Sequence, residues 1–205
     1  MAKTETSQKL TNMLKIISGQ FFEHDITYSL IGAFALNLYG LPKYTADIDL
    51  LTEGRFWASI KLIMEKLGYR CFQRTTFFAQ FDSELGVYGK IDFMFVNTDE
   101  GKNILERSAL INDDLLGCQP VIQPTDYIIL KLMAIANDSG RFPKDEADIL
   151  DVLKLHQEGL VPDGFERLDN KKVLLFAERF GQRERAEALF GQMGGKPKNR
   201  RKFKL

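Results

Sequence analysis

Apolar residues recur at helical spacing near the start of the chain and again over its last third. Residues 6–24 place Leu10, Leu14, Ile17 and Phe21 on one side, which predicts an amphipathic helix. Four later segments show the same spacing: 125–137, 144–157, 170–180 and 183–192. The chain therefore begins with a helix and is expected to be wholly helical after Pro124.

Between these helical regions, several segments alternate apolar and polar residues with the shorter period that is typical of strands. The predicted strands are 27–31, 47–52, 70–82 and 89–96, with a further short candidate at 121–122. The predicted short helices are 33–39, 54–68 and 102–107, and a turn at Ser83–Gly86 joins the third and fourth strands. This order predicts an α+β fold, a small mixed β-sheet flanked by helices and followed by a C-terminal helical subdomain.

The expected division of the chain is a core with its N-terminal helix at 1–120, a helical subdomain at 121–192 and a basic, disordered tail at 193–205. The whole chain of 205 residues has 28 basic and 28 acidic residues, but its last ten residues carry six basic residues and no acid. The rest of the chain is therefore net −6. The tail either binds RNA or is a solubilising end.

Composition also limits the location and the metal chemistry. No apolar run is long enough to cross a membrane, and the N-terminus does not resemble a secretory signal, so a cytoplasmic protein without a membrane partner is expected. Cys71 and Cys118 are then expected to be reduced. His24 and His156 have no second ligand at zinc-site spacing. Any bound metal should be a hard cation with oxygen ligands.

The most informative stretch is the strand that contains Asp47 and Asp49. Residues two apart on a strand point to the same face, so these two carboxylates project together while Ile48 enters the core. Adjacent carboxylates repel, and such a pair tends to share a proton or to hold cations. The alternative is a strand end with exposed acids, although Asp is disfavoured inside strands.

A third acid and a glycine add to this pattern. Asp92 is the single acid in the apolar run Ile91–Val96, where an ionised carboxylate needs a metal or another cation to compensate its burial. A salt bridge to a lysine such as Lys90 is the structural alternative. Gly32 stands between a strand and a helix, where a backbone without a side chain can approach phosphate. If the two acidic strands are neighbours, the three carboxylates form a triad.

The order strand, Gly32-Ala33, helix, Asp47-x-Asp49, strand, Asp92 resembles the signature of the DNA polymerase β-like nucleotidyltransferase superfamily. The run from Ile31 to Glu53 is most similar to the AbiEii/AbiGii-type toxin nucleotidyltransferases and their small relatives. Later segments agree with this resemblance, which covers about residues 25–155: Lys131-Leu-Met-Ala, and Arg141-x-x-Lys144-Asp145-x-x-Asp148.

The resemblance implies transfer of a nucleoside monophosphate from a nucleoside triphosphate, with two Mg²⁺ or Mn²⁺ ions on the carboxylate triad. It places Gly32, Ala33, Lys43, Thr45 and Lys131 around the nucleotide. Two departures affect nucleotide binding: Ala33 offers no hydroxyl where many relatives have serine, and Lys43 lacks the two-pronged fork of the arginine that relatives often carry. Thr45 either lines this pocket or caps its loop.

The later residues have structural alternatives. Lys131 lies in an apolar helix, where it either meets an anion or extends to solvent. Asp145 and Asp148 share one helix face and are expected to support the site from behind the metal ligands, pairing with Arg141 and Lys144.

Several functions follow from the resemblance. The expected acceptor is the hydroxyl of a tRNA, another RNA or a protein, and a toxin-like role would bring a cognate antitoxin as partner. The alternatives are a small-molecule nucleotidyltransferase of the aminoglycoside type and a non-catalytic relative that binds a nucleotide or a partner protein. The three acids favour an enzyme.

Overall fold

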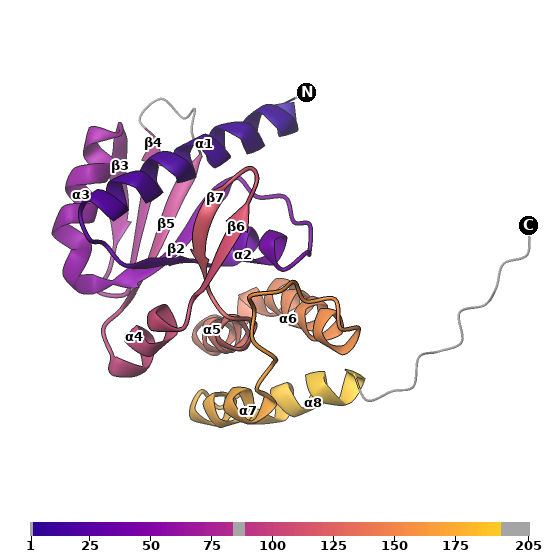
Figure 1. Ribbon diagram of the computed structural model, residues 1–205. Coiled ribbons are helices and arrows are strands. Elements are labelled where there is room, and N and C mark those ends of the chain that lie inside the picture. The colour runs from indigo at the N-terminus through magenta and orange to yellow at the C-terminus, as the bar shows by residue number, and fades with distance from the viewer. Residues whose placement is uncertain (1, 84–88, 194–205) are drawn as a thin grey trace, which may run out of the picture. The chain divides into compact units, whose positions relative to one another are not determined.

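A computed structural model of the chain describes residues 2–83 and 89–193 (Figure 1). The chain divides into two compact units, Met1–Gln123 with Pro162–Phe165, and Pro124–Val161 with the chain from Glu166 onward. The expected basic tail beyond Met193 and the residues of the predicted turn that follow Ser83 lie outside the described residues.

The first unit is built on a seven-stranded mixed sheet with the strand order β3-β4-β5-β2-β1-β7-β6. The strands are β1 (Tyr28–Leu30), β2 (Asp47–Glu53), β3 (Tyr69–Arg74), β4 (Phe78–Ser83), β5 (Lys90–Val96), β6 (Ala109–Asp113) and β7 (Gly117–Val121). The pairs β2–β5 and β1–β7 are parallel, and the other pairs are antiparallel. The helices of this unit are α1 (Ala2–Glu23), α2 (Gly32–Leu38), α3 (Trp57–Lys66) and α4 (Asp99–Glu106). The predicted α+β class with a small mixed sheet is confirmed.

The apolar stripe of α1 packs against one face of the sheet (Figure 1). Leu14, Ile17 and Phe21 are fully buried, and the Phe21 ring lies 6.1 Å from the ring of Phe93 on β5. The Trp57 ring of α3 lies 5.9 Å from the Phe81 ring of β4, whose strand partner is Ile91 on the same face. Since side chains alternate along a strand, Asp92 projects from the opposite face of β5.

Two parts of the sheet differ from the sequence-based expectation. The prediction of one strand at 70–82 was wrong, because residues 75–77 turn the chain and separate β3 from β4. The Thr75 amide donates a hydrogen bond to the Phe78 carbonyl (2.7 Å) within this turn. Strand β6 was missed, and β7 extends the short strand candidate at 121–122 toward the N-terminus.

The second unit is helical, as predicted. It contains α5 (Pro124–Asn137), α6 (Phe142–Gln157), α7 (Asn170–Arg179) and α8 (Arg183–Met193), with a 3-10 turn at Ser139–Arg141. The apolar side chains of α5 and α6 form its core, where Leu132 and Val152 are fully buried. Among the described residues, no helix combines the length and the apolar character that crossing a bilayer requires.

Candidate active site

The predicted carboxylates lie on two parallel neighbouring strands of the first unit. In the β2–β5 pairing, Asp49 stands beside Asp92 and Asp47 stands beside Lys90. Paired residues of neighbouring strands share a face, so all three carboxylates project from the face opposite α1. Each of the three residues is partly exposed, whereas the alternate positions Ile48 and Ile91 are fully buried. The sheet thus brings the three acids to one solvent-accessible surface.

Asp92 has the most unusual environment of the three. Its Oδ2 accepts a hydrogen bond from Nε2 of Gln80 (3.0 Å), the residue paired with it on β4. Its Oδ1 is buried and has no hydrogen-bond partner among the described residues. Burial raises the pKa of Asp92, the Gln80 hydrogen bond opposes this effect, and the negative charge of Asp47 adds to it, so the pKa lies above the ordinary value. An unpartnered buried carboxylate oxygen is costly, and a cation at this position would compensate it.

Asp49 packs directly against the backbone of Gly32. Gly32 has a φ of +60°, and a Cβ placed on it would lie 2.0 Å from Oδ2 of Asp49 and 2.6 Å from Cγ. The Ile31 amide also donates to the Asp49 carbonyl oxygen (3.1 Å). A glycine is therefore required here for two separate reasons, the left-handed backbone and the close approach of the carboxylate.

The loop before β2 holds Asp47. Oδ1 of Asp47 accepts hydrogen bonds from the Ala46 amide (3.0 Å) and the Thr45 hydroxyl (3.2 Å). Farther back, the side-chain amide of Asn37 bonds both the amide (2.6 Å) and the carbonyl (3.1 Å) of Lys43. Thr45 thus orients a candidate metal ligand, and the backbone of Lys43 is fixed to α2.

The three carboxylates are the candidate ligands for a metal ion. Within residues 2–83 and 89–193, no three acidic, histidine or cysteine side chains are grouped so that they hold a metal ion as they stand. The donor chemistry nonetheless fits a hard divalent cation, because three carboxylates share one face and Oδ1 of Asp92 lacks a partner. The three side chains would have to rearrange to hold an ion together.

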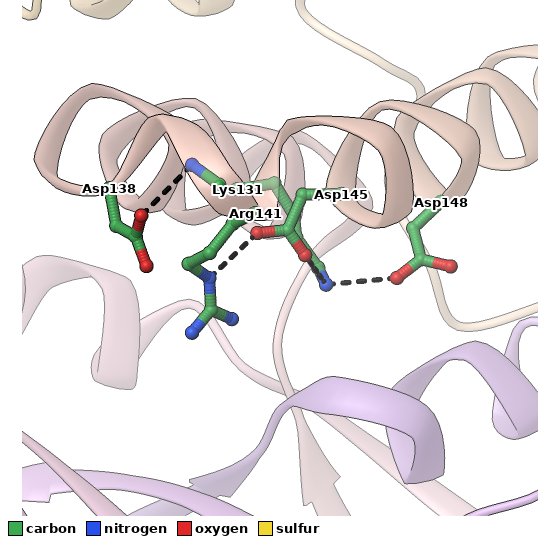
Figure 2. A network of polar contacts seen from close by, with 6 residues as sticks. Lys131, Asp138, Arg141, Asp145 and Asp148 are labelled. Atoms are coloured by element: carbon green, nitrogen blue, oxygen red, sulfur yellow. Dashed lines mark hydrogen bonds and ion pairs between the residues drawn. The ribbon is translucent and has the colours of Figure 1, made fainter.

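Of the remaining predicted residues, Lys131, Arg141, Asp145 and Asp148 form a network inside the helical unit (Figure 2). Nζ of Lys131 on α5 lies 2.6 Å from Oδ1 of Asp145 and 2.9 Å from Oδ2 of Asp148, both on α6. Nε of Arg141 lies 3.0 Å from Oδ2 of Asp145. The Asp145 side chain is 1% exposed, and that of Lys131 is 13% exposed. Lys144 is exposed.

This network has a clear electrostatic consequence. Burial alone would raise the pKa of Asp145, but the hydrogen bonds and charges of Lys131 and Arg141 outweigh it, and the pKa is lowered. The anions that Lys131 meets in the structure are two carboxylates of its own unit. The predicted pairing of Asp145 with Arg141 is present.

Sequence reasoning missed Gln80. Its only local signal is a polar residue between Ala79 and Phe81 in an apolar strand, and its relation to Asp92 depends on the pairing of β4 with β5. The structure therefore divides the predicted residues into two groups, one on the carboxylate face of the sheet and one in the helical unit.

The mixed sheet with its flanking helices is a fold that solved structures of nucleotidyltransferases share. No family model and no curated protein matches the sequence. Among solved structures, the antibiotic-resistance factor ANT(2'')-Ia is 15% identical with a TM-score of 0.57, over 94% of this chain and 100% of that chain. In complex with adenylyl-2''-tobramycin the same protein gives 16% identity and a TM-score of 0.58, over 85% and 98% of the two chains. The lincosamide antibiotic adenylyltransferase LnuA with bound lincomycin is 18% identical with a TM-score of 0.50, over 68% and 93%.

Proposed function

We propose that this protein is a metal-dependent nucleotidyltransferase that moves a nucleoside monophosphate from a nucleoside triphosphate to an acceptor hydroxyl. The observation that carries the proposal is the alignment of Asp49 beside Asp92 on parallel strands, with Oδ1 of Asp92 buried and without a hydrogen-bond partner among the described residues. Three acids on one sheet face are costly for a pure binding module, because their mutual repulsion has to be compensated.

In this proposal, Asp47 and Asp49 hold two Mg²⁺ or Mn²⁺ ions, and Asp92 holds one of them. The ions would neutralise the charge that develops on the phosphate oxygens. The acceptor oxygen attacks the α-phosphorus, the bond from that phosphorus to the bridging oxygen breaks, and pyrophosphate leaves. Asp92, as an ionised carboxylate beside the acceptor, would take the proton of the acceptor hydroxyl.

The nucleotide contacts are proposed from the same surface. Gly32 and Ala33 would present backbone amides to the phosphates, because the glycine allows a close approach without a side chain. Lys43 and Thr45 border Asp47 in the preceding loop and would contact the nucleotide there. Nζ of Lys131 donates to two carboxylates of its own unit, and its third N–H would donate to the triphosphate.

Two acceptor classes are proposed. A tRNA, another RNA or a protein follows from the toxin-type resemblance of residues 31–53, and a cognate antitoxin would then be a partner. A small hydroxylated molecule follows from the fold neighbours, since ANT(2'')-Ia and LnuA are both described with antibiotics and ANT(2'')-Ia matches this chain over nearly its full length.

The test supplies each α-phosphate-labelled nucleoside triphosphate with Mg²⁺ or Mn²⁺ to the full-length protein, in parallel with total RNA, lysate protein, aminoglycosides and lincomycin. Label on one of these acceptors, with pyrophosphate release, identifies the acceptor class. Asp49→Asn should abolish the transfer, whereas Asp99→Asn, which changes an exposed acid of α4, should not. Nucleotide binding without pyrophosphate release under every condition would replace the enzyme with the non-catalytic alternative.

A further inference from the structure

A cavity lies at the C-terminal end of the two acidic strands. Gly54 directly follows β2 and Asn97 directly follows β5, and both residues border this cavity of about 280 Å³. Asp49 and Asp92 each lie five residues before these positions. At the rise of an extended strand this separation is about 16 Å, so the cavity is distinct from the carboxylate face.

The walls of the cavity come from the end of β5, the start of the α3 region and the turn between β3 and β4. Arg74, Thr75, Thr76 and Asn97 form its polar side, and Trp57 and Phe95 form its apolar side. No acidic residue is among those that line it in the described part of the chain. A cavity with one cation and no carboxylate favours an anionic ligand.

Arg74 is held in a position suited to such a ligand. Its guanidinium carbon lies 4.1 Å from the centroid of the Trp57 ring. Stacking of this kind uses the flat face of the guanidinium and leaves the N–H groups at its edge to donate hydrogen bonds. Within residues 2–83 and 89–193, no carboxylate forms an ion pair with Arg74.

The opposite wall is fixed by hydrogen bonds rather than by packing alone. Nδ2 of Asn97 donates to the Thr76 carbonyl (3.3 Å), and the Phe95 amide donates to the Phe77 carbonyl (2.8 Å). The Thr75 hydroxyl accepts from the Phe77 amide (3.2 Å). These bonds tie the β3–β4 turn to the end of β5.

From this geometry we infer that the Arg74–Trp57 cavity, bounded by Gly54, Thr75, Thr76 and Asn97, binds a small oxyanion, a free phosphate or a carboxylate. Both groups match the two parallel N–H donors at the edge of a guanidinium. Ligand pockets for drug-sized molecules begin near 300 Å³, so this cavity suits a ligand smaller than a nucleoside triphosphate.

The test uses the full-length protein and inorganic phosphate as the probe. Trp57 is the single tryptophan of the chain and lines this cavity, so its fluorescence is a direct probe of ligand binding there. Phosphate should give a saturable change in fluorescence and a matching isotherm by titration calorimetry, beyond the effect of sodium chloride at equal ionic strength. Acetate in a parallel titration separates a phosphate site from a carboxylate site, because the ligand that the cavity prefers binds more tightly.

Four variants complete the design. Arg74→Gln should weaken binding at least about tenfold, and Arg74→Lys, which keeps the charge but loses the fork, should also weaken it. Arg70→Gln, on the same strand four residues earlier, is the matched control and should bind as the parent does. Asp49→Asn should also bind phosphate normally, which separates this cavity from the proposed catalytic face. If Arg74→Gln does not fold, Arg74→Lys decides the result.

Binding no stronger than that of chloride overturns the inference. Equal phosphate affinity in the parent and in a folded Arg74 variant, measured by calorimetry, also overturns it. Neither result bears on nucleotidyl transfer, because the two sites share no residue.

Discussion

The close contact between Gly32 and Asp49 makes Gly32→Ala the most informative single substitution. A methyl group at this position would lie 2.0 Å from Oδ2 of Asp49, whereas an ordinary contact begins at 3.4 Å. The carboxylate oxygen would have to move by about 1.4 Å, and Cβ of Asp49 would also lie only 2.8 Å from the new methyl group. A change of rotamer cannot move Cβ, so the backbone of one of the two residues must shift as well. The positive φ of Gly32 adds roughly 1–2 kcal/mol for any residue with a Cβ.

A matched control separates these two costs. Gly68 also has a positive φ, +80°, but a Cβ placed there would meet no atom within 4 Å. Gly68→Ala should therefore lose only the backbone contribution, roughly 1–2 kcal/mol, while Gly32→Ala should lose more than this, because the overlap with Asp49 adds to the same backbone contribution. Denaturant unfolding of the three proteins measures the difference.

Activity should separate the two variants more strongly than stability does. A displacement of about 1 Å at a catalytic group can cost about a hundredfold in rate, so Gly32→Ala should lose about that much label transfer, and Gly68→Ala should lose almost none. Weaker Mn²⁺ binding by Gly32→Ala alone would locate the defect at the metal site. Equal unfolding midpoints for the two variants, together with parental transfer by Gly32→Ala, would show that Gly32 does not confine the Asp49 carboxylate.

Three further predictions concern the buried charges. Burial raises the pKa of Asp92, so its ionised form opposes folding, and the stability linked to its protonated form is lost as pH rises through that pKa. Asp92→Asn should accordingly have a higher free energy of unfolding than the parent at pH 7, by no more than about 1 kcal/mol because the residue is partly exposed. Thermal unfolding should show this gain at pH 7 and its loss near pH 4. The variant should transfer no label. Gln80→Met removes the hydrogen bond to Asp92, so the affinity for Mn²⁺, measured by calorimetry, should fall about 10- to 100-fold. Because that bond lowers the pKa of Asp92, the acid limb of the pH–activity profile should move to higher pH. An unchanged acid limb would exclude a positioning role for Gln80. Lys131→Met leaves Asp145 with Arg141 alone and should cost about 3 kcal/mol in denaturant unfolding at pH 7. The lowered pKa of Asp145 stabilises the fold above its unfolded pKa and ceases to do so as pH falls through the folded value, so the difference between Lys131→Met and the parent should shrink in acid.

The elements that could be predicted from the sequence are those whose pattern is local. The stripe of α1 and the four helices after residue 124 have one apolar side that repeats every three or four residues, and the structure buries that side. The split of 70–82 into β3 and β4 could not be predicted in this way. Residues 75–77 contain neither glycine nor proline, so the turn has no strong local signal, and it forms because both flanking strands pair with neighbours.

The sequence predicted the parts of the candidate site that depend on local spacing, but not the contacts that depend on which strands and helices pair. The spacing of Asp47 and Asp49 places them on one face without further information. Gln80 and Asp92 are twelve residues apart in sequence and meet only because β4 and β5 are paired. The ion pairs of Lys131 also depend on α5 and α6 packing together, so the sequence indicated that Lys131 needs an anion but did not identify its partners.

The relative register of β2 and β5 places all three carboxylates on one face of the sheet. A shift by one residue would turn Asp92 to the face covered by α1, since neighbouring side chains alternate. Gly89 stands where this pairing begins, with a φ of +76°, and a Cβ on it would lie 2.5 Å from the Ala46 carbonyl oxygen, which accepts a hydrogen bond from the Lys90 amide (3.4 Å). Only glycine allows this approach, and the next pair in line is Asp47 with Lys90. Gly89 thus permits the pairing in which Ile91, Phe93 and Phe95 are buried and Asp92 faces the other side of the sheet.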